Sequence, residues 1–277
     1  MTTGDTKLIF ETRNLNYDYT GGIAALRQIN MAVGPGEMVA LLGANGSGKS
    51  TLLKLMDGLI FPTSGEVLAF GKPLSEKALK NAKFVQEFRR NVGLVFQDSD
   101  VQLFCPTVWD EVAFGPLQLG ISKDEVINRS EDVLKLLNID HLRERPPYRL
   151  SGGEKKKAAL ASVLSLQPQV LLLDEPTTGL DPQSQGKLID FLLNWNNGTN
   201  CVVFSTQDLD IVEETATRII VLGNEHSVVA DGEPERYLSD PDFLLKTNLI
   251  HEHSHRHKQL VHRHPHVHEH AHEHEHK

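Results

Sequence analysis

Apolar side chains follow two different patterns along the chain, and the patterns predict two kinds of sheet. Between residues 7 and 33, apolar and polar side chains alternate around Leu8, Phe10 and Leu15, and again around Ile29 and Met31, which is typical of strands in a β-rich lobe. Five later segments, 37–42, 92–96, 170–173, 201–205 and 219–222, are short apolar runs. Such runs are typical of parallel strands that are covered on both faces.

Helical spacing appears between these runs. A helix is predicted from Lys49 to about Gly58, and another over 123–138, where Ile127, Leu134 and Leu137 share one face. The repeated order of strand and helix predicts an α/β fold, with an N-terminal antiparallel β lobe. A mostly helical insertion, about 99–165, separates the second and third core strands.

The histidines divide the chain compositionally. Twelve of the fourteen lie between His251 and His276. We therefore expect one folded domain over 1–250, with its core at 1–98 and 166–250 and a helical subdomain at 99–165. Residues 251–277 are predicted to be a His-rich disordered tail.

Composition restricts the function classes. The formal net charge of −9 argues against nucleic acid as a partner. No apolar run approaches the roughly 20 residues that span a bilayer, and the first residues do not resemble a signal peptide. With only two cysteines, a cytosolic, reducing environment is expected.

A glycine-rich turn follows the strand at 37–42 and matches the phosphate-binding P-loop pattern. Backbone N–H groups and the start of the next helix would hold phosphate oxygens there, Lys49 would reach the β- and γ-phosphates, and Ser50 would bind Mg²⁺. The ATP-binding residues expected in this segment are Gly43, Asn45, Gly46, Ser47, Gly48, Lys49, Ser50 and Thr51.

Two acids stand at the end of the apolar run 170–173. In open α/β sheets, ligands bind beyond the carboxyl ends of the strands. Asp174 is therefore expected on the Mg²⁺ side, and Glu175 is expected to activate the water that attacks the γ-phosphate. ATP and Mg²⁺ are the implied cofactors.

The segment Leu-Ser-Gly-Gly-Glu at 150–154, shortly before these acids, resembles the signature motif of ABC ATPases. The resemblance extends over about residues 7–240 and implies a P-loop, RecA-like ABC ATPase core. In that family, the signature turn closes on the nucleotide of a second subunit. The resemblance thus implies that Ser151, Gly152 and Gly153 contact ATP across a homodimer, or across a pair with another ATPase.

Other family landmarks occur in the expected order. Tyr19 resembles the aromatic residue that stacks on adenine, with Tyr17 as the alternative. Gln97 resembles the Q-loop glutamine, so the implied Mg²⁺ ligands are Ser50, Gln97 and Asp174. Asp181 resembles the D-loop aspartate at the dimer seam.

One landmark departs from the family pattern. Gln207 stands where the family has a histidine that contacts the γ-phosphate. A glutamine amide donates a hydrogen bond but carries neither a proton to transfer nor a charge. We therefore expect Gln97, Glu175 and Gln207 to form the catalytic set, with ATP binding kept and hydrolysis slowed.

Residues 95–104 and 110–116 resemble the ATPases of energy-coupling-factor importers. There, two ATPases hold a transmembrane coupling subunit, which drives a separate substrate-binding membrane subunit. This resemblance implies a peripheral protein on the cytoplasmic face of the membrane. Val101, Leu103 and Phe104 would line a groove for a coupling helix, or else pack in the core.

The His-rich tail suggests a cargo. Neutral imidazole binds Ni²⁺, Co²⁺, Zn²⁺ and Cu²⁺, so the tail is expected to buffer transition metals. Cobalt/nickel importers of the energy-coupling-factor class are the family that both the tail and the Q-loop segment resemble. A purification tag and an idle tail are the alternatives. The expected metal-binding residues are His251, His253, His255, His257, His262, His264, His266, His268, His270, His272, His274 and His276.

The same motifs also suggest three alternative functions. The same ATPase could serve a vitamin importer, or Gln207 could convert it into a nucleotide-gated binding module, although Glu175 argues against a full loss of hydrolysis. A DNA-repair ABC ATPase would need long coiled-coil insertions or basic patches, which the sequence lacks.

Overall fold

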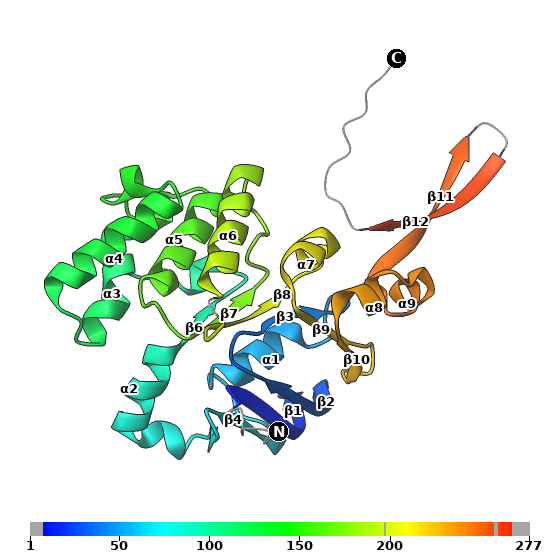
Figure 1. Cartoon of the computed structure of the whole chain (residues 1–277), viewed down its shortest axis with the longest axis horizontal. Coiled ribbons are helices and arrows are strands. Elements are labelled where there is room, and N and C mark those ends of the chain that lie inside the picture. The colour runs from blue at the N-terminus through cyan, green and yellow to red at the C-terminus, as the bar shows by residue number, and fades with distance from the viewer. Residues whose placement is uncertain (1–7, 197, 258–259, 268–277) are drawn as a thin grey trace.

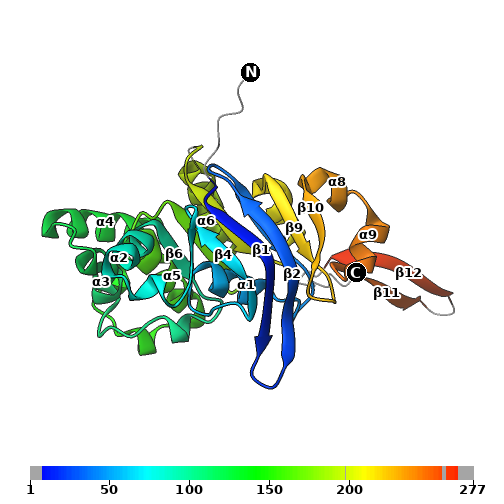
Figure 2. The same ribbon diagram turned by 90° about the horizontal axis from the view of Figure 1, so that it is seen from below.

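The structure, a computed structural model, describes residues 8–196, 198–257 and 260–267, and from residue 251 onward it describes the backbone alone. Two central sheets pack against each other (Figures 1 and 2). The four-stranded antiparallel sheet has the order β2-β1-β4-β5, and the six-stranded sheet has the order β10-β9-β3-β8-β7-β6. The first sheet consists of β1 (Phe10–Tyr19), β2 (Ile23–Val33), β4 (Ser64–Ala69) and β5 (Lys72–Pro73). The second consists of β3 (Met38–Leu42), β6 (Val92–Val95), β7 (Val170–Asp174), β8 (Cys201–Ser205), β9 (Arg218–Leu222) and β10 (Val228–Gly232).

The second sheet confirms the predicted α/β class. Its pairs β9·β3, β3·β8, β8·β7 and β7·β6 are parallel, and only the edge strand β10 runs antiparallel. Every residue of β3, β7 and β8 is buried, which explains their continuous apolar sequences. The five apolar runs match the observed strands to within one residue at each end.

The helices cover both faces of this sheet. Alternate residues of β7 enter different cores: Leu171 and Leu173 pack with the helices of one face, and Val170 and Leu172 pack with α1 and the antiparallel lobe. The main helices are α1 (Lys49–Met56), α2 (Ala82–Asn91), α3 (Val108–Gln118), α4 (Lys123–Leu136), α5 (Gly152–Leu164), α6 (Pro182–Trp195), α7 (Leu209–Thr215), α8 (Pro234–Leu238) and α9 (Pro241–Lys246). None of the helices in the described part of the chain is long and apolar enough to cross a membrane.

The predicted insertion contains α3, α4 and α5, which lie at one side of the molecule, opposite α8 and α9 (Figure 1). A buried hydroxyl joins two of its helices, because the Ser165 Oγ donates to the carbonyl oxygen of Val112 at 2.8 Å. At the start of α3, the buried Glu111 carboxylate accepts from the N–H groups of Phe104 and Cys105, at 2.9 and 2.7 Å. That carboxylate therefore holds the loop that follows the Q-loop in one position.

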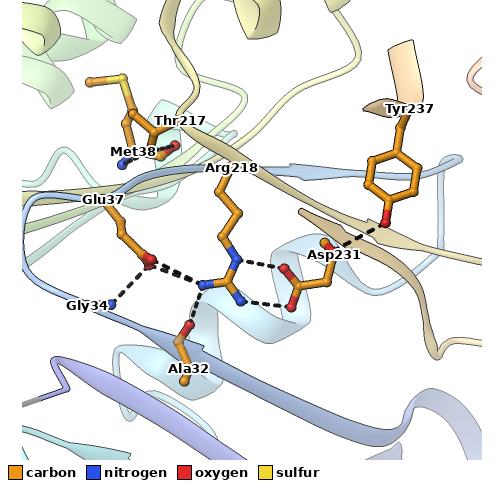
Figure 3. A network of polar contacts seen from close by, with 8 residues as sticks. All are labelled: Ala32, Gly34, Glu37, Met38, Thr217, Arg218, Asp231 and Tyr237. Carbon is orange, nitrogen blue, oxygen red and sulfur yellow. Dashed lines mark hydrogen bonds and ion pairs between the residues drawn. The ribbon is translucent and has the colours of Figure 1, made fainter. Parts of the chain in front are cut away.

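Arg218 joins the two sheets at the edge where β9 begins (Figure 3). Its guanidinium donates to both carboxylate oxygens of Asp231 on β10, at 2.6 and 2.8 Å, and to the carbonyl of Ala32 on β2, at 2.8 Å. A third contact reaches the Glu37 carboxylate at 3.3 Å. The arginine guanidinium carries five N–H donors in a fixed planar arrangement, which suits this set of carboxylate and carbonyl acceptors.

The C-terminal end differs from the sequence expectation. Leu249 and Ile250 are buried in the larger core, and the chain then forms a hairpin of β11 (Ile250–His257) and β12 (Leu260–Val267). The composition had predicted disorder from residue 251, but a histidine at every second position also has the two-residue period of a strand. Residues 268–277 lie outside the described residues.

Candidate nucleotide-binding site

The loop between β3 and α1 folds around its own lysine. The Lys49 side chain is buried, and its ammonium donates to the carbonyl oxygens of Gly43 at 2.7 Å and Ala44 at 3.1 Å. Gly48, at the N-cap of α1, has a φ of 109°, and a Cβ there would lie 2.4 Å from the carbonyl oxygen of Ala25 on β2. Only glycine therefore lets the loop turn into the helix against this strand.

The same loop offers donors that suit phosphate. The Ser47 side chain is 3% exposed, and its Oγ has no hydrogen-bond partner within the described residues. A Cβ at Gly46 would meet no atom within 4 Å, so this part of the turn faces open space. Because the first turn of α1 adds unpaired N–H groups and the positive end of its dipole, residues 43–51 fit the phosphates of a nucleotide.

Two neighbouring strands place the acids beside one serine. Asp174 ends β7 and lies opposite Ser205, which ends β8. The Ser205 Oγ donates to Asp174 Oδ1 at 2.6 Å and accepts from the Glu175 N–H at 2.9 Å. Glu175 takes the left-handed conformation, with a φ of 47°, and its carboxylate accepts from Thr178 Oγ1 at 3.2 Å. Ser205 therefore holds both acids at once.

The charges of the loop and of the acids influence one another. Burial raises the pKa of Glu175, and the Lys49 ammonium opposes that rise. Burial lowers the pKa of Lys49, and Glu175 and then Asp174 oppose that change. The fold thus brings the predicted lysine and acids together, and a glutamate with a raised pKa suits a general base near neutral pH.

The predicted Mg²⁺ ligands come from three elements around this edge. Gln97 follows β6, whose Val95 lies opposite Leu173 of β7, so it reaches the same end of the sheet as Asp174. Ser50 is on the first turn of α1. Carboxylate, amide and hydroxyl oxygens are the donors that Mg²⁺ prefers, so this donor set fits the ion chemically.

Gln207, which stands where the family has a histidine, contacts the phosphate loop directly. It follows β8 and Thr206, and its Nε2 donates to Asn45 Oδ1 at 2.6 Å. The sequence predicted both residues for the site, and the structure places them in contact across 162 positions of the chain.

The two tyrosines at the end of β1 have different surroundings. Tyr17 packs partly buried against the core of the antiparallel lobe, whereas Tyr19 is 41% exposed. The Tyr19 hydroxyl is 2.8 Å from Thr51 Oγ1 on α1, so the ring lies beside the phosphate loop. This geometry favours Tyr19 over Tyr17 as the adenine-stacking residue.

The signature turn faces solvent. Ser151 caps α5 in a capping box with Glu154, and Ser151 and Gly152 are exposed. Within the described part of the chain, the hydrogen bonds of Ser151 stay inside its own turn. Asp181 caps α6 and accepts from the Lys157 ammonium at 3.0 Å, which links the D-loop to α5. Bonds to Ser184 and then Lys157 lower the pKa of the Asp181 carboxyl.

Sequence reasoning missed two residues of this region, Ser205 and Lys156. Ser205 is the polar end of an otherwise apolar strand, which was the available signal. Lys156 is one of three consecutive lysines, and its burial became visible only in the fold. The side chains of the predicted metal-binding histidines lie outside the described residues.

Comparisons with known proteins agree with this geometry. The family model described as "ABC transporter" matches residues 26–178. A putative ABC transporter ATP-binding protein of Methanosarcina acetivorans is 50% identical over 88% of this chain and 90% of its own length. The energy-coupling factor transporter ATP-binding protein EcfA of Methanocaldococcus jannaschii is 43% identical over 87% of this chain and 85% of its own. The nickel import ATP-binding protein NikO of Rhodobacter capsulatus is 45% identical over 87% of this chain and 95% of its own.

Solved structures give the same fold. CbiO1 of Clostridium perfringens, part of the ABC transporter complex CbiONQ, superimposes with a TM-score of 0.70 at 36% identity, over 88% of this chain and 95% of that protein. The dimeric ATP-binding cassette MJ0796, in a post-hydrolysis state with ADP and Pi, gives a TM-score of 0.73 at 28% identity, over 81% of this chain and 98% of that protein.

Proposed function

This chain belongs to the ABC transporter family, as an ATPase subunit of the energy-coupling-factor class, and we propose that it powers the import of nickel or cobalt ions. Two observations support that cargo. The relative NikO is named for nickel import and aligns with most of this chain. In addition, twelve histidines, which are good ligands for both metals, stand at the C-terminal end.

We propose the following roles in hydrolysis. Ser50, Gln97 and Asp174 would hold Mg²⁺, which would supply positive charge to offset the charge of the phosphates. Lys49 adds positive charge at the phosphates, and Glu175 accepts a proton from the attacking water, for which its raised pKa is suited. Gln207 donates an amide hydrogen bond beside Asn45, which positions a γ-phosphate oxygen or the water but transfers no proton.

We propose that two ATPase subunits are needed to complete each site. The signature turn of one chain is exposed and makes local hydrogen bonds, so its donors are available to a neighbouring subunit. The structural neighbour MJ0796 is a dimer with ADP and Pi, which supports this arrangement. The second subunit is either another copy of this chain or a related ATPase.

The apolar residues after the Q-loop divide into two groups. Leu103 packs against the larger core, but Val101 and Phe104 are 67% and 69% exposed. Phe104 makes an edge contact with Phe114 on α3, with ring centroids 5.0 Å apart. The buried Glu111 fixes the Phe104 backbone. The exposed side chains of Val101, Phe104 and Phe114 therefore form a preformed apolar surface. We propose that a cytoplasmic helix of the transmembrane coupling subunit binds there, which would place this chain on the cytoplasmic face of the membrane.

We also propose that the His-rich segment binds transition-metal ions near the transporter. The backbone register of β11 and β12 sets His251, His253 and His255 opposite His266, His264 and His262. Opposite residues of an antiparallel pair are neighbours across the strands, about 4.5–5.5 Å apart at Cβ. An alternating histidine sequence therefore becomes paired positions in a hairpin.

Uptake of labelled ions tests the cargo. Cells that express this chain with its co-purifying membrane subunits should accumulate Ni²⁺ or Co²⁺, and Lys49→Ala should abolish the uptake. Deletion of residues 251–277 separates the tail from transport: if the tail buffers metal, uptake continues but saturates at a lower metal load. Accumulation of a vitamin without either metal would overturn the metal cargo and favour the vitamin importer. ATP binding without measurable turnover, restored by Gln207→His, would favour the nucleotide-gated module.

A further inference from the structure

One lysine of the signature helix is directed into the protein. Lys156 of α5 is 3% exposed, although it lies only five residues after Ser151. Its ammonium donates to three backbone carbonyl oxygens: Phe96 at 3.1 Å, Gln97 at 3.3 Å and Asp174 at 3.3 Å. Three donors thus meet three acceptors, and the buried charge is fully hydrogen-bonded.

The neighbouring lysines behave differently. The Lys155 ammonium forms an ion pair with the exposed Asp100 side chain at 2.5 Å, and the Lys157 ammonium pairs with Asp181 at 3.0 Å. Both of those contacts are charge pairs at the surface, the kind of contact that lysine usually makes. Lys156 instead has a buried ammonium that is bonded only to carbonyls, and removing a charge from water in this way is costly unless hydrogen bonds compensate for it.

The three carbonyls belong to the segments that carry the proposed Mg²⁺ ligands. Phe96 and Gln97 follow β6, and Asp174 is the last residue of the neighbouring strand β7. One ammonium therefore joins the backbone of Gln97 to the backbone of Asp174. Burial lowers the pKa of Lys156, and the carboxylates of Asp174, Glu175 and Asp98 oppose that change.

We propose that Lys156 is a positioning residue for ATP hydrolysis: its ammonium fixes the spacing between Gln97 and the Asp174–Glu175 pair to that required by Mg²⁺. The proposal rests on the proposed assignment of Gln97 and Asp174 as Mg²⁺ ligands. It also gives α5 a second task. Because Lys156 and Ser151 are on the same helix, a shift of the signature turn towards a partner's nucleotide moves the lysine and the carbonyls that it holds.

The experiment compares Lys156→Met, Lys156→Gln and Lys156→Arg with Lys155→Met in the full-length chain. Methionine keeps the length of the side chain but removes all donors, glutamine keeps two donors without charge, and arginine keeps the charge. For each variant, three quantities are measured: the thermal midpoint, ATP affinity in excess chelator, and the Mg²⁺ concentration that gives half-maximal turnover. The Mn²⁺ electron paramagnetic resonance spectrum of the ATP complex reports the ligands of the ion independently of turnover.

We expect Lys156→Met to bind ATP normally in chelator, because the phosphate loop is untouched. Its half-saturating Mg²⁺ concentration should rise by about 10–100-fold, the usual effect of losing a group that orients metal ligands, and its Mn²⁺ spectrum should change. Lys156→Gln and Lys156→Arg should fall between this variant and wild type. Lys155→Met should match wild type in Mg²⁺ dependence and in the Mn²⁺ spectrum.

Asp174→Asn and Gln97→Ala serve as references for a lost Mg²⁺ ligand. If these variants shift the Mg²⁺ dependence but the folded Lys156 variants do not, the role of Lys156 is overturned, even where the thermal midpoint falls. If neither reference variant shifts it, the ligand assignment is wrong, and the inference about Lys156 falls with it. Should Lys156→Met fail to fold, Lys156→Gln and Lys156→Arg decide between these outcomes.

Discussion

Ser205→Ala tests whether one hydroxyl holds both acids of the nucleotide site. The side chain is fully buried, and its Oγ makes two hydrogen bonds, to Asp174 Oδ1 at 2.6 Å and from the Glu175 N–H at 2.9 Å. Alanine removes the hydroxyl without adding bulk. The Glu175 N–H loses its acceptor, and Asp174 loses a donor.

The size of the effect follows from these two bonds. Leaving a buried partner without its hydrogen bond costs about 1–3 kcal/mol, so the loss of both should lower the free energy of unfolding by about 3 kcal/mol. For a chain of this size, that lowers the thermal midpoint by roughly 6–12 °C. Turnover should fall further than stability explains. Glu175 is held in a left-handed conformation with a φ of 47°, and a displacement of about 1 Å at a catalytic group costs up to about 100-fold.

Ser165→Ala is the matched control. Ser165 is also fully buried, and its Oγ donates to the carbonyl oxygens of Val112 at 2.8 Å and Ser162 at 3.0 Å, away from the nucleotide site. Both variants should lose stability, but only Ser205→Ala should lose turnover. Phosphate release is measured at a temperature about 20 °C below the lower of the two thermal midpoints and is normalised to the fraction of molecules that bind ATP. This measurement separates the loss of turnover from the loss of stability. Equal turnover in the two variants would refute the claim that Ser205 positions the acids.

Three further substitutions test the electrostatics of the fold. Gln207→His should raise turnover about fivefold, because a charged donor strengthens a hydrogen bond by about 1 kcal/mol, and steady-state phosphate release with an unchanged rate would contradict this. Glu175→Gln should retain ATP but lower turnover by about 100-fold or more, and the wild-type pH–rate profile should rise through an acid limb above the ordinary glutamate pKa. Burial raises the pKa of Asp57 from 3.8 to about 6, despite its ion pair with Arg89. Between these two pH values the folded state binds more protons than the unfolded state, so stability falls as the pH rises through that window. Urea unfolding from pH 4 to pH 7 should show this fall in wild type but not in Asp57→Asn, and parallel curves would refute it.

The sequence predicted the elements whose pattern is local. The buried parallel strands appear as continuous apolar runs because both of their faces are covered, and the observed strands agree with those runs. The phosphate loop was predicted for the same reason, since its glycines and its lysine are neighbours in the sequence. Helix α2 was not predicted: Phe84 and Phe88 have helical spacing, but the helix has only ten residues and only Phe88 is buried, so its apolar face is short.

The contacts that organise the site were not predictable in this way. Ser205 lies 31 positions from Asp174, and Lys156 lies 60 positions from Phe96. No periodicity in the sequence relates such distant residues, because their proximity depends on the order of β6, β7 and β8 in the sheet. A serine at the end of a strand and one lysine among three remain ordinary residues until the sheet order is known. The site therefore depends on the topology as much as on its motifs.

The signature helix connects these separate parts into one mechanical unit. Its first residue is capped by Ser151 at an exposed turn, and within the same helix the Ala159 carbonyl accepts from Gln102 Nε2 at 3.1 Å. Gln102 Oε1 in turn accepts from the Phe96 N–H at 3.1 Å, so the loop from 96 to 102 is attached to α5 at both ends, by Lys156 and by Gln102. The exposed apolar surface at Val101 and Phe104 continues directly from that loop. A rigid helix cannot move its signature turn without moving the loop attached to it. This coupling gives a physical route by which nucleotide, in the proposed site between two subunits, would change the surface proposed to bind the membrane partner.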